Sequence, residues 1–142
     1  AAAALVSARP DFAYRLAVRR LRDGLNSAGL TLPSIKARLP FNPVYVNPED
    51  MLFEGIREGD RVEVESAHGR IEVVAEADPN LRRGVVSIVH GFGRDAESGG
   101  KYEDGGVSIN RLLSLDPSSR ESINAMPWMS GIPVAIRRVS PD

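Results

Sequence analysis

The sequence of 142 residues is long enough for one domain, and its 42% hydrophobic and 26% charged residues are typical of a soluble globular protein. It contains no cysteine, which excludes a disulfide framework, a thiolate metal site, an iron–sulfur site and a cysteine nucleophile, and leaves cytoplasm and periplasm equally open. A net charge of −1 and the lack of a long apolar run argue against a nucleic-acid partner and against a membrane span.

The first residues suggest that the chain is a processed or excised fragment. The sequence does not begin with Met, and the alanines at 1–4 lack the basic start and the long apolar stretch of a signal peptide. We expect residues 1–11 to be a linker or disordered, and residues 12–142 to form the domain. Only Lys36 and Lys101 of the eighteen cationic residues are lysine. A GC-rich genome would explain this bias, although arginine also binds phosphate well through its planar guanidinium.

The first expected element is a strand that begins near Phe12 and ends near Arg19. Its apolar residues recur at every second position, which is the period of a strand, although Leu16 to Leu21 would also tolerate a helix. Residues 22–43 are interrupted by Pro and Gly, and we expect them to form a long loop. Loops of this length are usually functional or disordered.

A short strand at residues 44–46 is followed by a clear helix start. Asn47 is a suitable cap, Pro48 suits the first helical position, and two acidic residues follow where the helix dipole favours them. Gly55 is placed to end this helix in a left-handed conformation.

The rest of the chain has the pattern of closely spaced strands. These are expected at residues 61–66, 70–77, 84–90 and 132–139. Their inward-facing residues should be Val62, Val64, Ile71, Val73, Val134 and Ile136. Turns are expected at 59–60, 68–69 and 78–80, and a Gly-rich stretch fills 91–106. About six strands with one or two short helices favour a closed barrel over an open sheet in a chain of this size.

A series of short motifs resembles one known family. In chain order they are N-P-E-D at 47–50, G-I at 55–56, G-D-R-V at 59–62, G-R-I at 69–71, G-V-V at 84–86, H-G-F-G at 90–93, N-R-L-L at 110–113 and S-G-I-P at 130–133. Together they resemble the C-terminal molybdopterin-dinucleotide-binding domain of the dimethyl sulfoxide reductase family of molybdenum and tungsten oxidoreductases. The resemblance runs from Phe12 to the last strand. It implies a mainly β fold with short helices, namely a double-psi β-barrel of the aspartate-decarboxylase-like type.

The implied function is cofactor binding without catalysis by the domain itself. The cofactor would be molybdopterin guanine dinucleotide, with molybdenum or tungsten held by a ligand from elsewhere in the parent. The partners would be the other domains of that oxidoreductase, and the parent would be the enzyme. A variant is a free-standing small chain, as in formylmethanofuran dehydrogenases. Aspartate decarboxylases, which share this fold, form a pyruvoyl group by self-cleavage at a Gly-Ser bond. This activity is excluded because the sequence has no Gly-Ser pair.

The resemblance places the cofactor contacts in loops at one end of the barrel. The segment after the first strand supplies charged, amide and hydroxyl donors that suit a diphosphate. The alternative is a solvated basic strand edge that discourages aggregation. The candidate residues of this segment are Arg19, Arg20, Arg22, Asn26 and Ser27.

Two further places complete the implied site. The first is the segment His90, Gly91, Phe92 and Gly93, whose glycines let the backbone approach a ligand closely. His90 would hydrogen-bond the pterin or a neighbouring oxygen, or would alternatively be a satisfied core histidine, and Phe92 would stack on the ligand. The second is Asn110, whose amide offers a donor and an acceptor to a heterocycle edge. The acidic Glu103 and Asp104 are unexpected beside phosphates.

A second class of function is an interaction module that recognises peptides or nucleic acid without a cofactor. Double-psi barrels also serve in this way, as recognition domains of ring-shaped ATPases. The segment from Leu112 to Pro133 follows the oxidoreductase pattern, and an interaction module would not need it. The sequence contains no nucleophile elbow, so no catalytic constellation is predicted.

Overall fold

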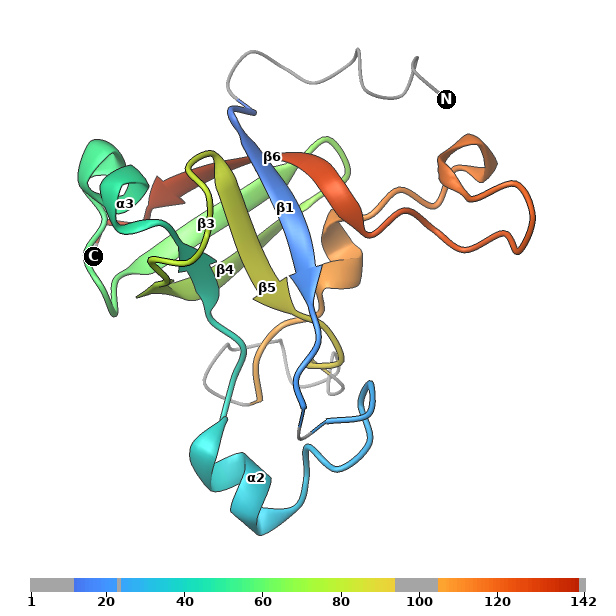
Figure 1. Cartoon of the computed structure of the whole chain (residues 1–142), viewed down its shortest axis with the longest axis horizontal. Coiled ribbons are helices and arrows are strands. Elements are labelled where there is room, and N and C mark those ends of the chain that lie inside the picture. Colours follow the sequence, from blue (N-terminus) through green and yellow to red (C-terminus); the bar gives the residue numbers. More distant parts are fainter. Residues whose placement is uncertain (1–11, 23, 94–104, 141–142) are drawn as a thin grey trace.

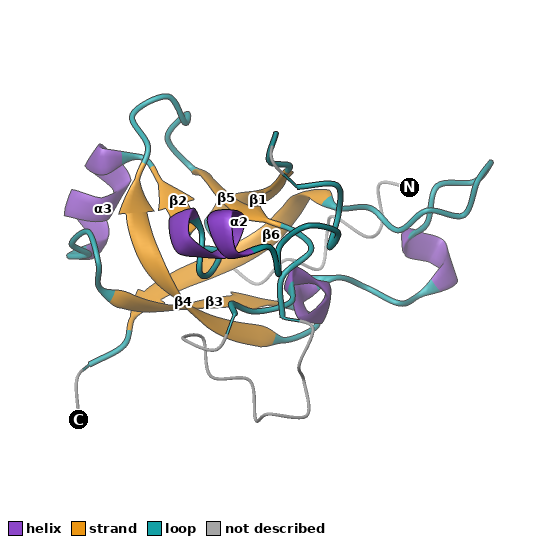
Figure 2. Cartoon of the chain, turned by 90° about the horizontal axis from the view of Figure 1, so that it is seen from below, coloured by secondary structure: helices purple, strands orange, loops and turns teal. Residues whose placement is uncertain are grey.

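Six strands close into a barrel in the order β1-β5-β2-β4-β3-β6 (Figures 1 and 2). The structure is a computed structural model, and it describes residues 12–22, 24–93 and 105–140. The elements are β1 (Tyr14–Arg19), α2 (Pro33–Arg38), β2 (Val44–Val46), α3 (Pro48–Glu54), β3 (Arg61–Ser66), β4 (Arg70–Ala77), β5 (Val85–Val89), the 3-10 helices η3 (Ile109–Leu112) and η4 (Pro117–Ser119), and β6 (Ser130–Arg138). No helix in this part of the chain is long and apolar enough to cross a membrane.

The sheet is mixed. β1 pairs with β5 and β2 pairs with β4 in parallel, whereas the other four pairings are antiparallel. A parallel neighbour requires a long connection. Residues 20–84 accordingly separate β1 from β5, while the antiparallel β3 and β4 form a simple hairpin. The mainly β barrel predicted from the sequence is therefore confirmed.

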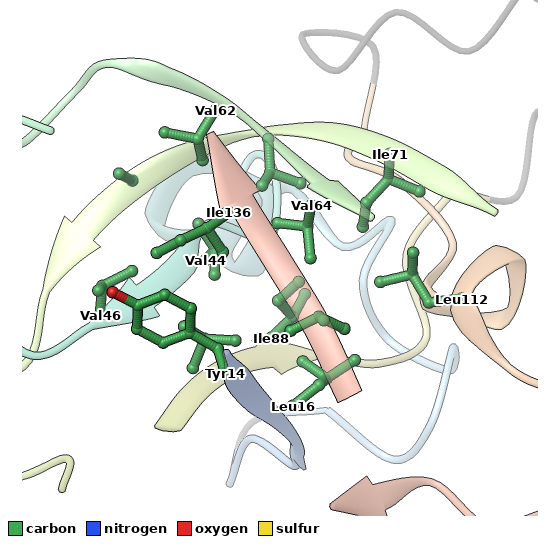
Figure 3. Close-up of a cluster of buried hydrophobic side chains, with 14 of the residues drawn as sticks. Tyr14, Leu16, Val44, Val46, Val62, Val64, Ile71, Ile88, Leu112 and Ile136 are labelled. Carbon is green, nitrogen blue, oxygen red and sulfur yellow. The ribbon is translucent and has the colours of Figure 1, made fainter. Parts of the chain in front are cut away.

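The predicted alternation of core residues is also confirmed. Val62, Val64 and Val134 are fully buried, and Ile71, Val73 and Ile136 are buried beside them. Figure 3 shows Val62, Val64, Ile71 and Ile136 converging inside the barrel together with Tyr14, Leu16, Ile88 and Leu112. Because side chains alternate across a strand, the residues between them point outward. The core is thus the interior of the barrel, and its ends carry the loops.

The helix predicted at residue 48 is formed as expected. The side chain of Asn47 accepts a hydrogen bond of 2.8 Å from the backbone N–H of Glu49, and Pro48 occupies the first turn. Gly55 ends the helix with φ of 67°, in the left-handed region that favours glycine. The buried Asp50 accepts a hydrogen bond of 2.6 Å from the N–H of Gly84 and so ties α3 to the start of β5.

Two expectations were wrong in detail. Residues 22–43 were predicted as a loop, but α2 forms within them. Its Pro33 stands at the first helical position, where proline starts a helix rather than breaking one. The last strand begins at Ser130 rather than at Ile132, because pairing with β1 extends it across Gly131 and Pro133. Residues 1–11, predicted to be a linker or disordered, lie outside the described residues.

The outer surface of β3, β4 and β6 is covered by paired charges. Arg61 lies 3.0 Å from Glu72, and Arg137 lies 3.1 Å from Glu63 and also contacts Glu65. Such exposed pairs contribute little to stability. They show, however, that this face of the barrel is suited to water.

Candidate functional site

The segments that follow β1 and β5 lie side by side. The two strands are parallel neighbours with Arg19 opposite Val89, and the N–H of His90 donates a hydrogen bond of 3.2 Å to the carbonyl of Arg19. We call this end of the barrel the loop end, and define it by residues 20–22, 24–28 and 90–93. Candidate residues that are about seventy positions apart in the sequence therefore meet at one rim.

A side-chain contact joins the two segments of the loop end. The Nε2 atom of His90 lies 3.1 Å from Oδ1 of Asn26. Since an amide oxygen only accepts, Nε2 carries the proton and Nδ1 is left as an acceptor. The Nδ1 atom is buried and has no hydrogen-bond partner among the described residues. Asn26 itself adopts a left-handed conformation, with φ of 56°.

Two glycines allow the loops to pack without a gap. At Gly91, which has φ of +96°, a Cβ would lie 2.4 Å from the carbonyl oxygen of Asn26. At Gly93, with φ of +76°, a Cβ would lie 2.4 Å from the backbone nitrogen of Ser108. A side chain at either position would push backbone away from backbone. The close packing that these glycines allow is with neighbouring loops of the protein, and their approach to a ligand stays a prediction.

Asn42 is the structural anchor that sequence reasoning missed. It is fully buried, donates hydrogen bonds of 2.9 Å to the carbonyls of Val89 and Val107, and accepts one of 2.9 Å from the N–H of Val107. One amide therefore ties the end of β5 to the segment that leads into η3. The only signal in the sequence is an amide set between Phe41, Pro43 and Val44, where a polar residue is unexpected.

The three candidate arginines differ in their surroundings. The guanidinium of Arg19 lies 2.6 Å from the carboxylate of Asp78 and 4.1 Å from the ring centre of Tyr45, so it is held against other groups of the barrel. Arg20 and Arg22 are exposed, and neither forms an ion pair within residues 12–22, 24–93 and 105–140. Among the residues that the structure describes at the loop end, the cationic charge that a ligand can reach therefore comes from Arg20 and Arg22.

The remaining candidates are placed as follows. Ser27 is exposed next to Asn26, and Asn110 is exposed in η3, two residues beyond the contact between Ser108 and Gly93. Phe92 is only 7% exposed, which leaves little of its ring for stacking on a ligand. The acidic residues 103 and 104 lie outside the described residues.

We expect His90 to titrate below the usual histidine range. Burial, and after it the positive charge of Arg20, lowers the pKa of His90. The unfolded chain therefore binds this proton at a higher pH than the folded chain, so His90 destabilises the fold as the pH falls below about 6.5. An imidazole titration by NMR checks this, and Arg20→Gln should raise the pKa only part of the way because burial remains. A measured pKa at or above about 6.5 would contradict the geometry.

Two concave sites lie away from the candidate residues. One, of about 380 Å³, is lined by Tyr14, Asp50 and Arg83 among others, but its polar groups already bind one another: Arg83 lies 3.1 Å from Asp50. The other, of about 260 Å³, lies between His68, Trp128 and the start of β6. The described residues contain no cluster of histidine and carboxylate groups that could hold a metal ion.

Comparison with known proteins gives a consistent picture. Residues 14–125 match the family described as the molydopterin dinucleotide binding domain. The chain is 39% identical over 75 residues to the probable dimethyl sulfoxide reductase chain YnfF of Escherichia coli. This match covers 53% of this chain and 9% of that protein. The chain is 25% identical over 133 residues to a tetrathionate reductase chain of Salmonella typhimurium, which covers 81% of this chain and 13% of that protein.

The fold has a solved counterpart in the acetylene hydratase of Pelobacter acetylenicus. That structure matches 90% of this chain with a TM-score of 0.76 and 19% identity, and the match takes up 18% of the hydratase chain. The chain thus spans a small part of each of these proteins. The family match extends over most of the barrel, including the loop end and η3. This chain therefore belongs to the family of molybdopterin-dinucleotide-binding domains of the dimethyl sulfoxide reductase family oxidoreductases.

Proposed function

We propose that this chain binds molybdopterin guanine dinucleotide at its loop end, as the C-terminal domain of a larger molybdenum- or tungsten-dependent oxidoreductase, and has no turnover of its own. The observation that carries the proposal is the exposed positive charge of Arg20 and Arg22, which no described carboxylate pairs, beside the His90–Asn26 contact. The family membership supports this assignment over a peptide- or nucleic-acid-recognition module. No feature of the described residues supports that alternative.

The donor set at the loop end fits a dinucleotide. A diphosphate is bound by guanidinium groups and by backbone and side-chain donors arranged in a loop. Arg20 and Arg22 supply the charge, while the hydroxyl of Ser27 and the amide of Asn26 supply neutral donors. The buried Nδ1 atom of His90 is an acceptor without a partner among the described residues, which is the group expected to meet an N–H of a pterin or purine after a small shift of the loop.

The chain's own residues bind and orient, and the cofactor supplies the redox chemistry of its metal when bound. In the proposal, Arg20 and Arg22 hold the diphosphate, and Asn110 pairs with a heterocycle edge. Asn26 fixes the tautomer of His90 by accepting from Nε2. Asn42 works indirectly, because it holds the end of β5 and the segment before η3 in register.

We also propose that the barrel is of the double-psi type. Its six strands include two parallel pairs, β1 with β5 and β2 with β4, which are joined through the antiparallel pair of β2 and β5. This near-symmetric arrangement supports the assignment.

We expect the chain to bind guanosine diphosphate weakly and in a salt-dependent way. Affinity for a fragment should be poor because an open half-site buries little of it, and salt should weaken it further because the diphosphate meets exposed arginines. Replacing both Arg20 and Arg22 by Gln should lower the affinity about tenfold or more, as hydrogen bonds to charged groups contribute about 1.5–3 kcal/mol each. Isothermal titration at low and high salt measures both effects.

The matched control is Arg61→Gln, which removes an exposed arginine from the outer face of β3. It should bind guanosine diphosphate as the unmodified chain does. Equal affinity of the double variant and the control, or affinity that does not change with salt, would show that the loop end does not hold the diphosphate.

A further inference from the structure

A projecting segment between η3 and β6 carries an unusual share of exposed apolar side chains. We call residues 114–129 the arm; Figures 1 and 2 both show it extending away from the barrel. Along it, Leu115 is 84% exposed, Ile123 91%, Met126 53% and Trp128 39%. Apolar residues scattered singly over a surface are normal, whereas four on one projecting segment mark a surface that another body covers.

The polar groups of the arm are turned toward the arm itself. The carboxylate of Glu121 accepts hydrogen bonds of 3.0 Å and 2.9 Å from the N–H groups of Ile123 and Asn124. The carboxylate of Asp116 accepts one of 2.8 Å from Ser118, and the guanidinium of Arg120 donates one of 3.2 Å to the carbonyl of Leu115. These polar groups are thus bound within the arm, while Leu115 and Ile123 are its most exposed apolar side chains.

Backbone bonds and one strained residue give the arm a defined shape. The N–H of Glu121 donates to the carbonyl of Met126 at 2.8 Å, and that of Trp128 donates to Ser119 at 3.2 Å. Ala125 adopts φ of 56°, a left-handed conformation that is unfavourable for a residue with a Cβ. Such strain persists where the surrounding structure requires it, often at a clamp or a contact site. Ile123 is thus held at the apex of a preformed turn.

The arm contrasts with the outer face of β3, β4 and β6. The outward residues of β3, β4 and β6 are paired charges, such as Arg61 with Glu72. That face presents paired charges to water, whereas the arm exposes large apolar side chains between its polar residues. A preformed apolar element loses little conformational entropy when it docks, which favours tight contact with a matching cleft.

We propose that the arm docks into an apolar cleft formed by the remaining domains of the parent oxidoreductase chain. The matched stretches make up only 9% and 13% of the two related reductases compared above, so most of each of those chains lies outside the match. The family match runs to residue 125 and so includes most of the arm. This inference rests on the part of the proposed function that places the domain in a larger chain, but not on cofactor binding.

The test compares the 142-residue chain with the full-length parent protein. Ile123→Ser with Met126→Ser should change the melting temperature of the 142-residue chain by less than about 1 °C, because both side chains are already exposed. In the full-length protein the same two substitutions should make limited proteolysis cut this domain free about tenfold faster, since a docked domain is cleaved only when it detaches from its neighbours. Arg61→Ser with Glu72→Ser is the matched control and should change neither result.

Two outcomes would overturn the inference. One is equal release of the domain from the unmodified and the Ile123/Met126 full-length proteins. The other is that the 142-residue chain forms a dimer and that the same two substitutions make it monomeric. The partner of the arm would then be a second copy of the chain. Both results are independent of guanosine diphosphate binding, because Ile123 and Met126 lie outside the loop end. If the arm does not dock but guanosine diphosphate still binds, only this inference is refuted. If the arm docks but guanosine diphosphate does not bind, only the cofactor proposal is refuted.

Discussion

Val64→Asp is expected to lower the free energy of unfolding by about 3–5 kcal/mol, because it buries a carboxyl group that has no partner. Val64 is fully buried, opposite Ile71 of β4 and Ile136 of β6, so these neighbours offer no side-chain hydrogen bond. Domains of ordinary stability have about 5–15 kcal/mol to lose. A denaturant titration followed by circular dichroism measures the change.

The control for this prediction lies on the same hairpin. Glu72 is exposed on β4 and its carboxylate pairs with Arg61, across the strand pair. Glu72→Gln should therefore change stability by less than about 0.5 kcal/mol. An unchanged midpoint for Val64→Asp would mean that the alternation of β3 does not point Val64 into the barrel.

Asn42→Ala should be comparably destabilising and should also weaken the loop end. The substitution leaves the N–H of Val107 and the carbonyls of Val89 and Val107 without the amide that binds them in a dry environment. A buried group left unpaired costs about 1–3 kcal/mol, so the total should reach at least about 3 kcal/mol. Thermal unfolding measures the loss of stability, and hydrogen exchange at Val107 measures the loss of protection.

The conservative variant Asn42→Asp separates shape from hydrogen bonding. It keeps the side-chain volume but replaces the donor that serves both carbonyls by an acceptor. It should be destabilised at least as much as Asn42→Ala. Stability close to that of the unmodified chain in either variant would show that Asn42 is not the anchor of this loop.

Features set by local rules were predictable from the sequence. The period-two pattern identifies Val62 and Val64 as inward residues, and the cap at Asn47 and the left-handed Gly55 define α3, because each depends on residues within a few positions. The closed barrel followed from the number and spacing of the strands. The helix α2 was missed because it is short and buries no residue, so it leaves no periodic signal.

Long-range contacts were not predictable in the same way. Asn42 meets partners 47 and 65 residues away, and Arg19 meets Asp78 at a separation of 59. Nothing in the local sequence pattern reveals that Arg19 forms an ion pair with Asp78. The family resemblance indicated which loops to consider. The choice among the arginines needed the contact of Arg19 with Asp78, and the meeting of the two loops at one rim needed the parallel pair of β1 and β5.

The central claim, a dinucleotide site at the loop end, is tested most directly by mapping backbone amide shifts while guanosine diphosphate is added to the chain. The proposal predicts that the largest shifts occur at Arg20, Asn26, His90, Gly91 and Asn110, with smaller shifts elsewhere. It also predicts that the same amides stop responding in the Arg20→Gln, Arg22→Gln variant. Shifts confined to residues 47–59 around α3, with the loop end silent, would contradict the site even though the fold is that of the family.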